Sequence, residues 1–165
     1  MKILLDADAS IKLTKIGFME ILSSGFDVIL TDVVYDEHVN VGLKRGYPDA
    51  KEMERSISEK KVLVVQVKKE ALIFHGLNLG RGEISIITYC QENHVDVVVS
   101  DDVAFLKVLK SMKSVPFIPV SVTLIPGIEH GLIDKDEALE FLELLKDMIK
   151  ADHYLYVKSE IEGLK

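Results

Sequence analysis

Short apolar runs alternate along this chain with longer stretches in which apolar residues recur every three or four positions. The runs predict buried strands, and the longer period predicts amphipathic helices. The predicted strands are Ile3–Leu5, Phe26–Leu30, Val62–Val67, Val95–Val99 and Phe117–Val120. The predicted helices span residues 11–22, 32–41, 49–60, 68–77, 83–93, 104–112, 121–132, 138–149 and 152–165. Strands that alternate with helices in this way are typical of an α/β fold with a mostly parallel sheet of about five strands, covered on both faces.

Single positions refine these elements. The segment 11–22 is expected to form one amphipathic helix, and the charged helix over 49–60 is expected to lie in solvent. The continuous apolar run Val62–Val67 predicts a strand buried on both faces. Pro119 predicts an edge position for the last strand, and Pro126 with Gly127 predicts a break in the helix over 121–132. Asp134 and Glu137 have the spacing of a capping box.

Acidic residues follow two of the predicted strands. Asp6 and Asp8 follow the first strand, and Asp101 and Asp102 follow the fourth, directly after Ser100. Open α/β sheets bind their ligands at the carboxyl ends of the strands. If the first and fourth strands are neighbours, these carboxylates lie side by side.

Two glutamates stand in apolar helix faces near the same edge. Val34, Glu37 and Val41 have the spacing i, i+3, i+7, which puts them on one face of a helix capped by Thr31. Glu83 stands at the start of a helix whose apolar face includes Ile86. Both helices begin at the carboxyl edge of the sheet, so both glutamates can join the aspartates in one crevice. Simpler roles are a helix cap for the aspartates, a dipole contact for Glu83 and a lysine partner for Glu37.

A cluster of carboxylates needs a counter-charge. Two carboxylates ~5 Å apart at an effective dielectric constant of ~20 repel by roughly 3 kcal/mol. Such a site is expected to take up protons or a cation, and oxygen ligands alone select Mg²⁺ or Mn²⁺. Arg81, close to Glu83, is a candidate phosphate contact, and Asp8, Thr31 and Ser100 are candidate supporting residues.

Composition limits the class of protein. The 165 residues are 48% hydrophobic, which is consistent with one domain over 1–165 whose part 121–165 is helical. No apolar run reaches the roughly 18 residues of a membrane span. A chain with a single cysteine, Cys90, cannot form an internal disulfide, which is consistent with a protein of the reducing cytoplasm. A net charge of −7 argues against nonspecific nucleic-acid binding through a basic surface.

Four segments resemble, in order, the blocks of the PIN-domain family of metal-dependent ribonucleases, which includes VapC-type toxins. They are LLDADASIKLTKIG, VILTDVVYDEHV, LGRGEISIITYC and VVVSDDVAFLKVL, within residues 1–120. The resemblance implies an α/β/α sandwich that cleaves RNA with Mg²⁺ or Mn²⁺, often as a homodimer and, in toxin members, with a cognate antitoxin. It implies catalytic roles for Asp6, Glu37, Glu83 and one or both of Asp101 and Asp102, with Asp6, Glu83, Asp101 and Asp102 as metal ligands.

Other interpretations fit part of the pattern. A haloacid-dehalogenase-like phosphatase also begins with a strand and Asp-x-Asp, so that Asp6 would be the nucleophile and Asp8 the acid/base. Thr31 and the pair Asp101-Asp102 suit that family too, whereas Glu37 and Glu83 have no role in it. A phosphoacceptor receiver domain fits less well, because its acceptor aspartate lies on a middle strand. A PIN-like module that has lost activity and only binds a partner is the third alternative.

Overall fold

The described residues form five parallel strands in one sheet. The computed structural model describes residues 1–67, 79–112 and 115–164. The sheet has the order β3-β2-β1-β4-β5, and every pairing is parallel. The strands are β1 (Lys2–Leu5), β2 (Asp27–Thr31), β3 (Val62–Val65), β4 (Val97–Val99) and β5 (Phe117–Ile118).

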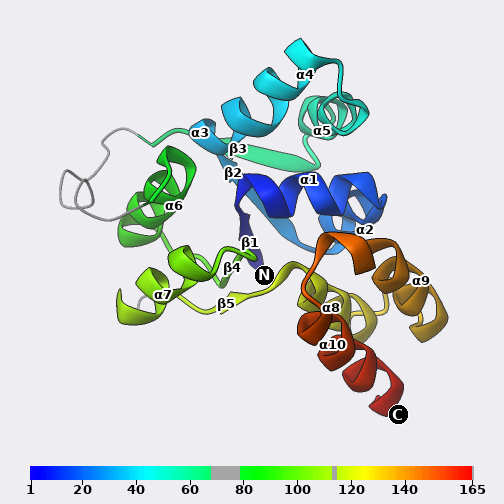
Figure 1. Ribbon diagram of the computed structural model, residues 1–165. Helices are drawn as coiled ribbons and strands as arrows, with labels where there is room; N and C mark the ends of the chain where they lie inside the picture. Colours follow the sequence, from blue (N-terminus) through cyan, green and yellow to red (C-terminus); the bar gives the residue numbers. More distant parts are fainter. Residues whose placement is uncertain (68–78, 113–114, 165) are drawn as a thin grey trace.

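Helices cover both faces of this sheet. In chain order, the helices before β3 are α1 (Ala7–Lys15), α2 (Phe18–Gly25), α3 (Asp32–Tyr35), the π-helical turn η1 (Asp36–Asn40), α4 (Val41–Arg45) and α5 (Pro48–Ser58). The described helices after β3 include α6 (Arg81–Glu92), α7 (Val103–Met112), α8 (Leu124–Glu129), α9 (Lys135–Leu145) and α10 (Ala151–Gly163). In Figure 1, α6 and α7 lie on one side of the sheet and α1, α2 and the C-terminal helices on the other. The predicted three-layer α/β/α arrangement is confirmed.

The first and fourth strands are neighbours at the centre of the sheet, as predicted. Leu5 pairs with Val99 at the ends of β1 and β4. The next backbone amide, that of Asp6, donates to the Val99 carbonyl over 3.2 Å. The acidic residues that follow the two strands therefore leave the sheet side by side.

The predicted helix over 11–22 is wrong in its extent. It begins earlier, at Ala7, because the Asp6 side chain caps the first turn. It is also two helices, since Gly17 lies between α1 and α2 with φ +77°. Glycine adopts this left-handed conformation without steric cost, which allows the chain to turn there.

The predicted face of Val34, Glu37 and Val41 is also wrong. Val34 is buried, but Val41 is 36% exposed, and His38 and Val39 are buried in its place. The cause is the π-helical turn, which adds a residue to the turn and shifts the face that points inward. Glu37 is exposed in this turn and does not belong to an apolar stripe.

Three expectations near the sheet edges have different outcomes. The strand after residue 61 is an edge strand instead of a doubly buried one, and its Leu63 is 48% exposed. Helix α5 is amphipathic instead of fully solvated, because Asp49, Ala50 and Met53 are buried in it. β5 is the other edge strand, as Pro119 predicts. The helix predicted over 68–77 lies outside the described residues.

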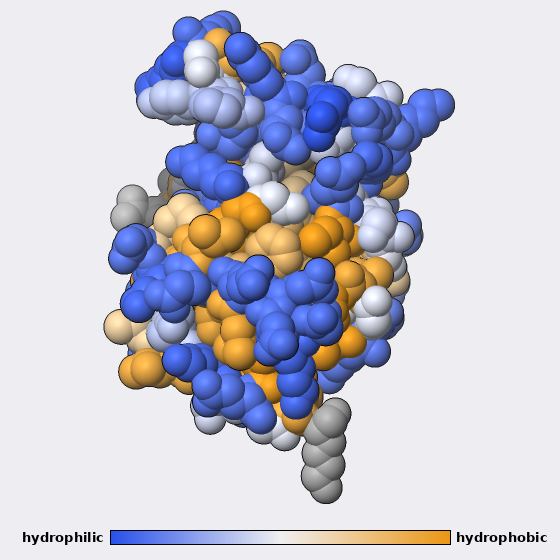
Figure 2. Space-filling model, turned by 90° about the vertical axis from the view of Figure 1, so that its right-hand side faces the viewer, coloured by the Kyte–Doolittle hydropathy of each residue, from blue (hydrophilic) through white to orange (hydrophobic). Residues whose placement is uncertain are grey.

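The C-terminal part of the chain is helical, and its helices expose apolar side chains. The segment 121–132 is divided, into a 3₁₀ turn (Val120–Thr123) and α8, but the predicted place of the break is wrong. Pro126 and Gly127 lie inside α8, where Pro126 stands in the first turn and so breaks no intrahelical hydrogen bond. The capping box of Asp134 and Glu137 opens α9. Figure 2 presents the side of the molecule where the C-terminal helices lie, and apolar residues gather over much of it below a polar upper part. The exposed large apolar side chains on α9 and α10 are Leu144, Leu155 and Tyr156. Among the helices in the described ranges, none has the length and apolar character that crossing a membrane requires.

Candidate active site

A cavity of about 470 Å³ opens at the carboxyl edge of the sheet. It brings together the acids that the sequence singles out, from the residues that follow β1 and β4 and from η1 and α6. Its other walls come from α1 and from the segment that joins α9 to α10. The residues that line it are Asp6, Ala7, Asp8, Lys12, Glu37, Gly80, Gly82, Glu83, Asp101, Asp102, Met148, Ile149 and Lys150.

Asp6 is the most buried of these acids. Its Oδ1 accepts a 2.6 Å hydrogen bond from the Ala9 amide, so it caps α1 while it faces the cavity. Burial raises the pKa of Asp6 to about 6, and hydrogen bonds from Ser100 and Ala9 offset part of that rise. The negative charges of Asp8 and Asp101 raise the pKa further. The site thus holds this carboxylate at a free-energy cost that a proton or a cation relieves.

Glu37 reaches the cavity from the π-helical turn. Its Oε1 accepts a 3.2 Å hydrogen bond from the Gly82 amide at the start of α6. A Cβ atom at position 82 would overlap Glu37 Oε2, so the absence of a side chain at Gly82 makes room for this carboxylate. Glu37 is exposed at the mouth of the cavity, but partial burial of its carboxyl group raises its pKa, while the Gly82 amide and the positive charge of Arg81 act against that rise.

Glu83, on α6, is close to Glu37 of the π-helical turn. Its Oε2 accepts a 2.6 Å hydrogen bond from the Gly80 amide, which turns the side chain back over the start of its own helix. Burial raises the pKa of Glu83, and the charges of Asp102 and Glu37 raise it further. Glu83 is therefore close enough to both Asp102 and Glu37 for their negative charges to repel its own.

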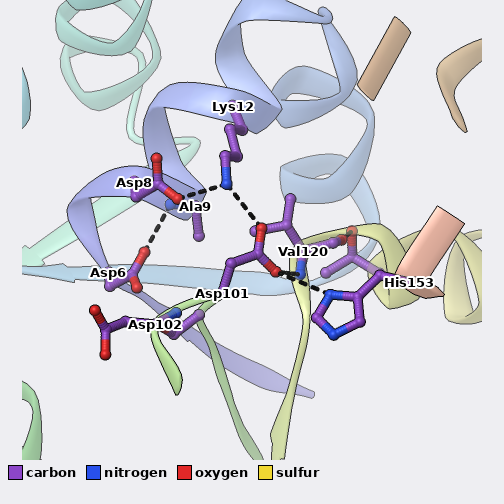
Figure 3. A network of polar contacts seen from close by, with 10 residues as sticks. Asp6, Asp8, Ala9, Lys12, Asp101, Asp102, Val120 and His153 are labelled. Atoms are coloured by element: carbon purple, nitrogen blue, oxygen red, sulfur yellow. Dashed lines mark hydrogen bonds and ion pairs between the residues drawn. The ribbon is translucent and has the colours of Figure 1, made fainter. Parts of the chain in front are cut away.

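Asp101 and Asp102 leave β4 in different directions. In Figure 3 Asp101 points toward Lys12 and His153, whereas the Asp102 carboxylate points the other way. Asp102 Oδ1 accepts a 2.8 Å hydrogen bond from the Phe105 amide and so caps α7. Asp101 engages both oxygens, because Oδ2 accepts from Lys12 Nζ over 2.8 Å and Oδ1 from the Val120 amide over 3.0 Å.

The predicted supporting residues lie around this cluster. The Ser100 hydroxyl accepts from the Asp102 amide over 3.0 Å and lowers the pKa of Asp6. Thr31 Oγ1 accepts from the Val34 amide and lies 2.7 Å from Ser85 Oγ, which links the start of α3 to α6. Asp8 is largely exposed at the rim, 2.6 Å from Lys12. Arg81 is exposed at the first position of α6 and is not among the residues that line the cavity.

The sequence reasoning missed several polar residues. Lys12 lies between Asp8 and Asp101, and His153 Nδ1 on α10 is 3.9 Å from Asp101 Oδ1. Ser10 Oγ is 2.7 Å from His38 Nδ1 in the protein interior. The spacing i, i+4 of Asp8 and Lys12 was a usable signal. It was hidden because the helix was expected to start at residue 11. The periodicity of the sequence carries no signal for the π-helical turn that buries His38.

The donor atoms of the cavity suit a hard divalent cation. Within the three described ranges, no group of three His, Cys, Asp or Glu side chains stands together as a ready metal-binding set. The cavity nevertheless contains only carboxylates as anionic ligands, and oxygen ligands favour Mg²⁺ or Mn²⁺. Three of these carboxyl groups, Asp6, Glu37 and Glu83, have raised pKa values. The side chains therefore fit such an ion by chemistry and charge, and they must turn toward one another to hold it.

Comparison with known proteins gives one result for nearly the whole chain. A family model described as a PIN domain matches residues 2–161. The match includes all the cavity residues and the C-terminal helices α8 and α9, so it extends beyond the four sequence blocks. No curated protein and no solved structure matches the chain.

Proposed function

The chain belongs to the PIN-domain family, whose members are generally nucleases, and we propose that it is a divalent-metal-dependent endoribonuclease that hydrolyses RNA phosphodiester bonds. One observation carries the proposal. Acids from four separate elements line a single cavity at the carboxyl edge of the sheet, and burial raises the pKa of three of them. A purely structural role does not require that these costly groups converge.

We assign the ion to Asp6, Glu83 and Asp102, with Glu37 completing the acidic wall. Asp101 was an equal candidate from the sequence, but both of its oxygens are engaged by Lys12 and the Val120 amide. Backbone amides hold one oxygen of each assigned carboxylate, which limits the conformations that the side chain can adopt. A bound Mg²⁺ or Mn²⁺ would orient water as the nucleophile and stabilise the charge that develops on the phosphate.

Positive groups beside the cavity are the proposed contacts of the RNA backbone. Arg81 stands near Glu37 and acts on its pKa, and Lys150 lines the cavity before α10. The chain has a net charge of −7, so RNA must be held by such local groups and not by a basic surface. These local groups favour contacts with the part of the RNA backbone that lies next to the reacting phosphate.

We further propose that the protein is cytoplasmic and acts as the toxin of a toxin–antitoxin pair. Its partner would be an antitoxin protein, and its assembly a homodimer. The resemblance to VapC-type toxins supports this role. The exposed apolar side chains of α9 and α10 supply a surface that a partner can cover. Growth arrest on expression, relieved by co-expression of a neighbouring small open reading frame, tests the toxin role, and light scattering tests the dimer.

RNA cleavage by the purified full chain tests the central proposal. We expect cleavage of a mixed RNA substrate with Mg²⁺ or Mn²⁺, its loss with EDTA and its loss in Asp6→Asn. Asp27→Asn is the matched control, because Asp27 is an exposed aspartate at the opposite end of the neighbouring strand β2. Cleavage that survives both EDTA and Asp6→Asn would contradict a metal-dependent site.

The same experiment separates the alternatives. Trapping a phospho-aspartate on Asp6 would identify the phosphatase mechanism. RNA binding without cleavage at any tested divalent ion would identify an inactive binding module. The match to the PIN-domain family over residues 2–161 favours the nuclease over the phosphatase, because it includes Glu37 and Glu83, which have no role in the latter.

A further inference from the structure

Lys12 places a fixed positive charge inside the acidic cavity. Its Nζ lies 2.6 Å from Asp8 Oδ2 and 2.8 Å from Asp101 Oδ2. The Lys12 side chain is only 12% exposed, and it lines the same cavity as the proposed ion ligands. A long lysine side chain normally extends into solvent, so this placement needs an energetic reason.

The two carboxylates that hold Lys12 supply that reason. Burial lowers the pKa of Lys12, but hydrogen bonds and charge from Asp101 and Asp8 outweigh it and raise the pKa above its ordinary value. The ammonium group is therefore charged at neutral pH. It occupies the position between Asp8 and Asp101.

The cavity acids fall into two groups as a result. Asp8 and Asp101 form one group with Lys12, and Asp101 is held further by the Val120 amide and faces His153. Asp102, which points away from this group in Figure 3, and Glu83 influence each other's charge and form the other group with Glu37. Asp6 is close enough to the first group for the charges of Asp8 and Asp101 to act on it, and it lines the same cavity as the second group.

We propose that Lys12 is a positioning residue that takes the place of a second divalent cation, so that the cavity binds one ion instead of two. This inference rests on the metal site of the proposed function and adds its stoichiometry. The ammonium group satisfies Asp8 and Asp101 permanently and leaves a single ion to the group of Asp6, Glu83 and Asp102. Loss of the Lys12 charge should open a second ion site at Asp8 and Asp101.

Counting bound Mn²⁺ tests the inference without any RNA. Calorimetry and the electron paramagnetic resonance of free Mn²⁺ should give one ion per wild-type chain and two per Lys12→Met chain. The double variant Lys12→Met/Asp8→Asn should return to one ion, because it lacks a carboxylate of the second site. Lys15→Met is the matched control on the same helix, since Lys15 is exposed, and it should bind one ion.

A second substitution covers a failure of Lys12→Met to fold. Lys12→Gln removes the charge but keeps hydrogen-bond donors for Asp8 and Asp101, and it should also bind two ions. Two ions per wild-type chain, or one ion in the folded variant that lacks the Lys12 charge, would overturn the inference.

The ion count and the cleavage assay fail independently. If the RNA stays intact while the wild type binds one ion and Lys12→Met binds two, the inference stands and the ribonuclease proposal fails. Metal-dependent cleavage by a wild-type chain that binds two ions does the reverse. A wild-type chain that binds no Mn²⁺ removes the metal site and the inference together.

Discussion

Ser10 Oγ and His38 Nδ1 lie 2.7 Å apart in the protein interior and join α1 to the π-helical turn η1. On its other side, His38 Nε2 is 3.3 Å from Asp49 Oδ2 on α5. Asp6 caps helix α1, and the π-helical turn carries Glu37 next to His38. The buried imidazole therefore fixes how the two elements that present these acids sit relative to each other.

Replacing His38 should destabilise the fold. The ring is 1% exposed, and His38→Ala leaves a cavity and removes the partner of both Ser10 and Asp49. We expect a loss of about 2–4 kcal/mol in the free energy of unfolding, measured by urea denaturation. The control His94→Ala, whose side chain is 80% exposed, should change stability by less than about 0.5 kcal/mol. A His38→Ala variant as stable as this control would exclude the structural role of His38.

Adding a single methyl group at Gly82 should impair the site while the fold remains intact. The Cβ of Gly82→Ala would overlap Glu37 Oε2, although the helical backbone at position 82 accepts alanine readily. We expect at least tenfold weaker Mn²⁺ binding and slower RNA cleavage, with an unchanged circular dichroism spectrum. Gly80→Ala is the control, because its Cβ would meet Glu83 Oε2 at an ordinary 3.6 Å. Equal Mn²⁺ affinity in the two variants would show that the position of Glu37 does not matter for the ion.

Much of the fold follows from the sequence because burial imposes a clear pattern. The apolar runs of β1 and β4 locate the central strands, and the acids after them mark the carboxyl edge. The missed features depend on contacts between distant segments. His38 is buried because a π-helical turn meets Ser10 and Asp49. Lys12 is partly buried because Asp101, which follows β4, reaches it from a distant part of the sequence. Periodicity carries no information about such contacts, so it predicted a wrong face for Glu37.

Asp101 and Asp102 should behave differently when their charges are removed. Asp102→Asn keeps an oxygen that can cap α7, so we expect a stable protein that binds Mn²⁺ at least tenfold more weakly. Asp101→Asn leaves the partly buried Lys12 with only Asp8, so we expect a loss of about 1–3 kcal/mol in stability and a smaller change in Mn²⁺ affinity. Calorimetry and urea denaturation of both variants measure these effects. The reverse order of Mn²⁺ affinities would make Asp101 the ligand.

The raised pKa of Asp6 predicts how stability depends on pH in the absence of metal. The pKa of Asp6 is about 6 in the folded protein, compared with an ordinary value of 3.8. The folded state therefore binds the proton more tightly than the unfolded state, so ionisation destabilises the fold. As the pH rises from about 3 to about 7, the contribution of Asp6 to stability should fall by about 3 kcal/mol and then level off.

His38 acts in the opposite direction over part of this range, and Asp6→Asn separates the two. Burial lowers the pKa of His38, so its contribution is lost as the pH falls below its ordinary value of 6.5. The difference in unfolding free energy between wild type and Asp6→Asn removes the His38 effect and should decline from pH 4 to pH 7. Saturating Mg²⁺ should stabilise the wild type at pH 7 and much less at pH 5, where protons compete for Asp6. A difference that stays constant with pH, with Asp27→Asn as the control, would show that Asp6 has an ordinary pKa and is not held at a cost.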